Sequence, residues 1–93
     1  SMSGVILRSA NVRGGNFESA DLSRAVLTDI EGQGANFTRA RLPSANMRGA
    51  DLRGAVLNRV DGHMARFEDA DLRGAALGDA SFIKASFRDA DLR

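Results

Sequence analysis

The apolar positions of this chain of 93 residues recur every five residues. Alanine occupies nearly every multiple of five from residue 10 to residue 90, the exceptions being Gly15, Ile30 and Val60. A bulky apolar residue follows each of these positions by two in almost every unit, and all five phenylalanines lie in this second column. The chain is therefore one short unit copied end to end.

A period of five fits neither of the common secondary structures. Apolar positions at i, i+2, i+5 and i+7 spread around a helix at about 100° per residue, and in one continuous strand the odd step turns the side chain to the other face. We therefore expect each unit to be a short extended segment followed by a bend. Glycine occupies the last place of many units, where a bend benefits from its permissive backbone; these are Gly14, Gly34, Gly49, Gly54 and Gly74.

Three units show the pattern most clearly: 20–24 (ADLSR), 50–54 (ADLRG) and 70–74 (ADLRG). They resemble the A(D/N)LXX signature of the pentapeptide-repeat protein family, and the resemblance covers essentially residues 5–93. It implies an all-β fold, a right-handed quadrilateral β-helix with four units per coil. About four and a half coils would then stack at the strand spacing of about 4.8 Å.

The domain organisation follows from the same pattern. We interpret Ser1 as a cloning remnant and residues 1–4 as a lead-in. Residues 5–93 are expected to form a single domain, which we interpret as part of a longer protein.

Four units per coil would place every fourth unit in one column. One interior ladder is then Leu7, Leu27, Met47, Phe67 and Phe87, and the opposite one is Phe17, Phe37, Leu57 and Leu77. Outside, the columns of opposite charge are Arg13, Arg53, Arg73 and Arg93 beside Glu31, Asp51, Asp71 and Asp91. We expect the charges of these two columns to cancel.

The repeat is broken twice, at Gly32 and Gly62, and each glycine follows a unit start that has become large, Ile30 or Val60. The first hypothesis is compensation, in which Ile30 and Val60 fill the volume that the glycines vacate. The alternative is a local bulge or a looped-out unit. Because the breaks are six units apart and a coil would take four, they should lie on opposite faces.

The interrupted units are the candidate interaction site, because function concentrates where local rules fail. A defect that the fold tolerates is the competing interpretation. The candidate residues are Ile30, Gly32, Gln33, Val60, Gly62, His63 and Met64. Outward apolar residues are few, namely Ile6, Val26, Val56, Met64 and Ile83, and any patch that gathers them would be the first candidate interface.

Composition excludes several functions. With 13 Lys plus Arg against 12 Asp plus Glu, the net charge of +1 favours neither nucleic acid nor an anionic membrane. Cysteine is absent, so no thiolate can bind a metal or act as a nucleophile. His63 stands near Asp61 but has no nucleophile or pocket, so we expect no catalytic residue, no bound metal and no cofactor. No signal segment or membrane span is evident, which suggests a cytoplasmic location.

These observations favour a non-enzymatic protein–protein interaction module, or a structural scaffold or spacer. The alternative, implied by the family resemblance, is a DNA-mimicking regulator of DNA gyrase or another type II topoisomerase, although such mimics resemble longer, acidic rods. Partners are expected to be proteins. A homodimer through uncapped coil ends is a further possibility, because unpaired strand edges pair readily.

Overall fold

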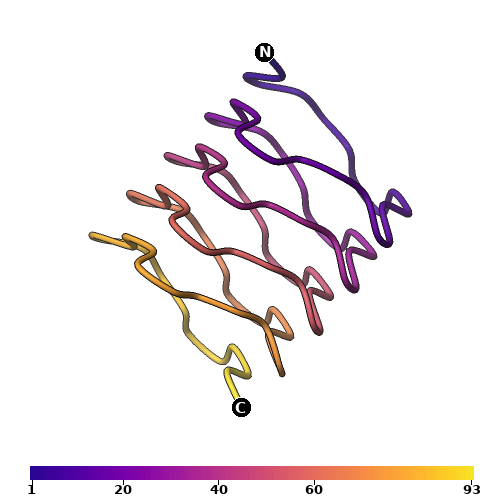
Figure 1. Cartoon of the computed structure of the whole chain (residues 1–93), viewed down its shortest axis with the longest axis vertical. Coiled ribbons are helices and arrows are strands. Elements are labelled where there is room, and N and C mark those ends of the chain that lie inside the picture. Colours follow the sequence, from indigo (N-terminus) through magenta and orange to yellow (C-terminus); the bar gives the residue numbers. More distant parts are fainter.

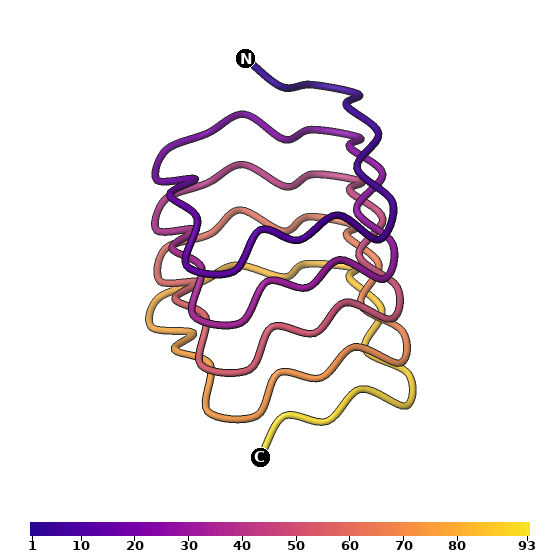
Figure 2. The ribbon, with the colours of Figure 1, turned by 90° about the vertical axis from the view of Figure 1, so that its right-hand side faces the viewer.

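The β structure of the chain consists of isolated parallel bridges. The computed structural model describes residues 1–93 and contains no helix and no strand longer than a single bridging residue. Each bridge joins a residue to its counterpart four units later, from Ile6↔Val26 to Asp71↔Asp91. The chain therefore completes one coil every four units, and Figures 1 and 2 show the coils stacked with the two termini at opposite ends. This arrangement is a β-helix.

The units are joined by turns that require a left-handed residue. The carbonyl of the bulky central residue accepts a hydrogen bond from the N–H three positions on, as in Phe37 O to Ala40 N at 2.9 Å. The residue before that N–H has a positive φ at every turn from residue 4 to residue 89, and only six of these eighteen residues are glycine. A positive φ at the third turn position is the type II pattern. The backbone conformation of each turn is thus the same whichever side chain the turn carries.

Backbone hydrogen bonds connect successive coils in both directions. Leu52 donates to Asp71 O at 2.7 Å, and Asp71 donates back to Ala50 O at 2.9 Å. The register already includes Met2, which donates to Asp21 O at 2.8 Å, so residues 2–4 follow the repeat as well. Since each inner coil bonds to the coils on both sides, the stack is continuous.

The core is a narrow column of alanines and large apolar side chains. Its 19 buried residues extend from Leu22 to Leu72. The predicted interior ladders are confirmed: Phe17 stacks on Phe37 and Phe67 on Phe87, each with ring centroids 5.0 Å apart. Burial of each such side chain contributes about 1.5–3 kcal/mol. A rigid core of this kind presents its turn residues at fixed positions on the surface.

Candidate interaction surface

The β-helix continues through both repeat breaks without distortion. Glu31 bridges to residues 11 and 51, and Asp61 bridges to residues 41 and 81. The turns are intact as well, with Ala35 donating to Gly32 O at 3.0 Å and Ala65 donating to Gly62 O at 2.9 Å. The alternative of a bulge or a looped-out unit is therefore wrong.

The space beside Gly32 is filled from two sides. A Cβ atom added to Gly32 would lie 3.0 Å from Leu52 Cδ2 and 3.6 Å from Ile30 Cδ1. Ile30 is only 1% exposed, so its enlarged side chain lies inside the coil. The compensation hypothesis is confirmed for Ile30.

The space beside Gly62 is filled differently. A Cβ atom there would lie 2.5 Å from Phe82 Cδ1 and 2.8 Å from Phe82 Cε1, so the ring from the next coil occupies the position. This ring meets Phe67 and Phe87 edge to face, at centroid distances of 5.6 and 5.1 Å. Val60 is buried but contributes none of the atoms nearest to that position. The ring of Phe82, one coil away, therefore lies closest to the space of Gly62, and the filling of this space by Val60 stays a prediction.

The seven candidate residues do not form one site. Four of them, Ile30, Gly32, Val60 and Gly62, are buried, and the remaining three are the half-buried Gln33 and His63 and the exposed Met64. The two breaks are six units apart in a coil of four units, which places them on opposite faces. Only the second break brings an apolar side chain to the surface.

One corner of the β-helix carries all the apolar turn residues. Each unit has two outward turn positions, and apart from glycines the only apolar residues at these positions are Pro43, Met64 and Ile83. They belong to successive coils at the same corner, where Met64 N donates to Ile83 O and Ser44 N donates to His63 O, both at 2.8 Å. We call these three residues the apolar edge. Of the five outward apolar residues that the sequence singled out, Met64 and Ile83 meet at this edge, and Ile6 and Val26 bridge on another face.

Folding does not explain Met64. Its φ is +58°, and every other residue with a positive φ is glycine, serine, aspartate, arginine or lysine. A left-handed conformation costs a residue with a Cβ roughly 1–2 kcal/mol. Met64 is nevertheless 50% exposed, and its neighbour Ile83 is 60% exposed. About half of this apolar residue therefore stays in contact with solvent.

The charged turn residues at the corner of the apolar edge are cationic. Arg24 and Lys84 occupy the same turn column as Met64, and neither takes part in an ion pair. No turn residue at this corner is acidic. A partner that covers the edge would therefore meet positive charge on both sides.

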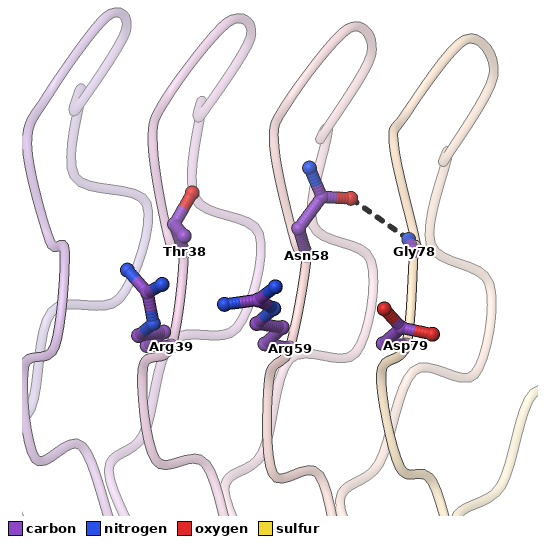
Figure 3. Close-up of a pocket in the computed structure, with 6 residues that line it drawn as sticks. All are labelled: Thr38, Arg39, Asn58, Arg59, Gly78 and Asp79. Atoms are coloured by element: carbon purple, nitrogen blue, oxygen red, sulfur yellow. Dashed lines mark hydrogen bonds between the residues drawn. The ribbon is translucent and has the colours of Figure 1, made fainter.

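The adjacent corner forms a shallow polar groove of about 360 Å³ (Figure 3). We call it the arginine groove, and it is lined by Thr38, Arg39, Asn58, Arg59, Gly78 and Asp79. Gly78 N donates to Asn58 Oδ1 at 2.8 Å, which leaves the amide nitrogen of Asn58 free to donate to a ligand. Arg39 makes one long ion pair, at 3.8 Å with Glu18, and Arg59 makes none.

On the face that contains Gly32, the charged side chains are paired with one another. Arg53 and Arg73 bind the carboxylates of Asp51 and Asp71 at 2.7 and 2.6 Å, and they reach the carboxylate of the next coil at 3.8 and 3.7 Å. The hydrogen bond from Arg73 lowers the pKa of Asp71 to about 2. The expected cancellation of charge on this face is confirmed.

No three His, Asp or Glu side chains lie together in a geometry that could hold a metal ion. Asp61 Oδ1 accepts the backbone N–H of His63 at 3.2 Å, so this contact does not orient the imidazole as a base. The structure contains no helix, and therefore none that could cross a membrane. The candidate functional features are therefore two surfaces, the apolar edge and the arginine groove.

Sequence reasoning named Met64 and Ile83 as outward apolar residues but did not place them side by side, and it missed Pro43 and the arginine groove. The coil of four units was applied to the interior ladders, but the same register also aligns Pro43, His63 and Ile83. Applied to the turns, it would have shown Met64 beside Ile83. The groove had a weaker signal, since it depends on side-chain directions that the register does not fix.

Comparisons with known proteins agree with the fold. A family model described as pentapeptide repeats matches eight copies, over residues 1–31, 20–59 and 65–93. A search of curated proteins found no match.

Solved structures resemble the chain over nearly its whole length. HetL, a pentapeptide repeat protein involved in heterocyst differentiation regulation from the cyanobacterium Nostoc sp. strain PCC 7120, is 27% identical with a TM-score of 0.81, over 95% of this chain and 47% of its own. A pentapeptide repeat protein from the Arabidopsis thaliana thylakoid lumen is 25% identical with a TM-score of 0.77, over 98% of this chain and 63% of its own. The chain thus spans about half of HetL and under two thirds of the plant protein. The likeness identifies the coil as a right-handed β-helix.

Proposed function

The chain belongs to the pentapeptide-repeat family, and on this premise we propose that it is a non-enzymatic protein–protein interaction module. The observation that carries the proposal is the apolar edge. Pro43, Met64 and Ile83 are the only apolar turn residues of the chain, and all three lie at one corner in successive coils. Apolar side chains that gather at one corner of an otherwise polar surface favour a binding role.

A protein partner suits this surface better than a nucleic acid does. The net charge of +1 offers no general attraction for phosphates. The five phenylalanines lie in the interior column, and the chain has no Tyr or Trp on which bases could stack. The relative HetL is involved in heterocyst differentiation regulation, and a regulatory role agrees with an interaction module.

The finer architecture belongs to the same proposal. We infer a quadrilateral cross-section, with one repeat unit on each side and about four and a half coils at the strand spacing. The bridge register of four units supports it. We further propose that residues 5–93 are one rigid domain of a longer polypeptide, for which it also serves as a spacer.

Differential capture tests the interaction role. The wild-type chain, the double variant Met64→Gly/Ile83→Ser and the control Asp89→Gly are immobilised and exposed to the same cell extract. Asp89 is the matched control because its φ is also positive, at +60°, and it lies at another corner. We expect a protein that wild type and control retain and the double variant loses. Equal capture by all three baits would contradict the proposed role of the edge.

The gyrase alternative is separated by a supercoiling assay. The interaction proposal predicts unchanged supercoiling by DNA gyrase at micromolar concentrations of this chain, because its charge is balanced and not acidic. Inhibition of supercoiling, or protection from a gyrase-directed drug, would support the alternative instead.

The homodimer proposal applies to the isolated chain of 93 residues. In its last coil the N–H groups of Leu77, Phe82 and Phe87 donate to no backbone carbonyl. Such an edge pairs with another strand when one is available. We propose that two copies associate through these edges, and light scattering that finds only monomers at high concentration would contradict this.

A further inference from the structure

We propose that the face between the apolar edge and the arginine groove binds an amphipathic helix that carries acidic side chains on a partner protein. This inference rests on the interaction function proposed above and adds the chemical class of the partner. The face itself consists of the outward residues Arg41, Asp61 and Ser81. The two features that bound it are complementary to the two rows of side chains that such a helix presents.

The dimensions of the face suit a helix. The chain passes from the turn residue Arg59 in the groove to the turn residue His63 beside the edge in four residues, so the face is at most about 13 Å wide. A helix with its side chains is about 10–12 Å wide. A helix lying along the face would therefore place one row of side chains at the groove and another row at the edge.

The spacing along the axis also favours a helix. Successive coils are about 4.8 Å apart, and one helical turn rises about 5.4 Å. Side chains at i, i+3 or i+4, and i+7 thus meet three successive coils, the number over which both the groove and the edge extend. Alternate residues of a strand rise about 6.6 Å and fall out of step by the third coil.

Charge selects acidic side chains for the row that meets the groove. Arg59 has no ion-pair partner, and Arg39 already forms an ion pair with one carboxylate, that of Glu18, at 3.8 Å. The free amide nitrogen of Asn58 adds a further donor, and Figure 3 shows both arginines on the same side of the groove, on neighbouring coils. Guanidinium groups bind carboxylates through two donors at once. Asp79 at the far end of the groove disfavours a doubly charged phosphate more than a carboxylate.

The apolar row of the helix meets Met64 and Ile83. Methionine adapts to irregular apolar shapes because its side chain is unbranched and flexible. Lys84 follows Ile83 directly and is exposed, so acidic groups that flank the apolar row find a cation there too. Cations therefore lie on both sides of the face, whose own two charged residues, Arg41 and Asp61, are opposite in sign.

A designed peptide provides the probe. It is a helix of five turns with a leucine stripe and Glu at i and i+4 beside the stripe, and the comparison peptide has Lys in place of each Glu. Titration into the isotopically labelled chain is followed by amide NMR shifts. We expect the Glu peptide to shift the amides of Arg39, Arg59, Met64 and Ile83, and the Lys peptide to bind at least about tenfold more weakly, a difference of about 1.4 kcal/mol.

Two variants and two controls locate the binding. Arg59→Glu and Met64→Gly are each expected to weaken the Glu peptide by about tenfold. Arg88→Glu and Asp89→Gly are the matched controls, since Arg88 is likewise exposed and unpaired and Asp89 likewise has a positive φ. Neither control should change the affinity. Glycine at residue 64 suits its left-handed backbone, so the fold is retained in that variant.

Several results would overturn the inference. Equal binding of the two peptides, no binding of the Glu peptide at millimolar concentration, or unchanged affinity in Arg59→Glu would each do so. Preferential binding of a single-stranded RNA or of phosphatidylserine vesicles would do the same and would assign the groove to another class of partner. If only Met64→Gly weakens a captured partner, the interaction function stands and the acidic helix fails; if the capture experiment shows no difference, the function itself fails.

Discussion

The two repeat breaks begin from the same change in sequence and end in different surfaces. At Gly32 the space of the missing side chain is filled by Ile30 from the same repeat unit and by Leu52 from the next coil. The turn that follows is polar, with Gln33 Nε2 donating to Asp51 at 2.8 Å. At Gly62 the ring of Phe82 enters the space, and the turn that follows carries Met64 outward.

The comparison shows that the way the core is filled at a break and the residues exposed beside it are separate matters. Both breaks are repaired inside, because the bridges and turns run through them unchanged. The second break carries Met64 and lies beside Ile83 at the apolar edge, whereas the first lies on a face where arginine and aspartate neutralise each other. A break in the repeat is therefore not itself a sign of a binding site.

The largest predicted effect compares Ile30 with Val60. Ile30→Ala should lower the free energy of unfolding by about 3 kcal/mol, because it opens a cavity next to the space already vacated by Gly32. Val60→Ala should cost only about 1–2 kcal/mol, since Phe82 keeps that region filled. Urea unfolding of both variants measures the difference, and equal losses would contradict the two modes of filling.

Adding a methyl group to each glycine sharpens the comparison. Gly62→Ala should cost about 2 kcal/mol, because its Cβ would lie 2.5 Å from the ring of Phe82. Gly32→Ala should cost less than about 1 kcal/mol, because the obstructing atom is the flexible end of Leu52. The control is Gly62→Ala in a Phe82→Leu background, where the penalty should shrink. A penalty unchanged in that background would show that Phe82 is not the obstacle.

How far the sequence predicts the molecule differs between these two regions. The period of five predicts a solenoid of short units, and the family resemblance implies the coil of four units, from which follow the interior ladders and the neighbouring columns that contain Asp71 and Arg73. The occupant of the space at Gly62 was missed, because the register shows which residue lies below but not that the Phe82 ring turns inward. The apolar edge was within reach of the register, whereas the arginine groove depends on rotamers that no repeat pattern specifies.

The turns that follow the two breaks predict opposite outcomes. Met64→Gly should raise the free energy of unfolding by about 1 kcal/mol, since it relieves a left-handed residue with a Cβ. Gly34→Met, at the corresponding place after the first break, should lower it by about 1 kcal/mol for the same reason. Thermal unfolding measures both. A loss of stability in Met64→Gly would mean that Met64 contributes to the fold and not only to a surface.

The smallest effect concerns acid and the charged face. Hydrogen bonds from Arg53, Arg73 and Arg93 lower the pKa values of Asp51, Asp71 and Asp91. A lowered pKa in the folded chain stabilises it above the ordinary pKa of aspartate, near 4, and this contribution is lost as the pH falls toward about 2. The melting temperature should therefore drop between pH 4 and pH 2, and less so in Asp71→Asn. An identical drop in that variant would mean that other carboxylates cause it.

The left-handed turns have a consequence for how this surface can change. Because every turn holds its backbone in one shape with glycine, serine, aspartate, arginine, lysine or methionine alike, the outward positions behave as a grid whose rows are the coils and whose columns are the corners. Exchanging residues at intervals of four units rewrites one column and leaves the core untouched. Surface recognition and folding thus depend on different positions of the five-residue unit. New binding specificities can therefore be engineered by substituting the residues of one column at a time.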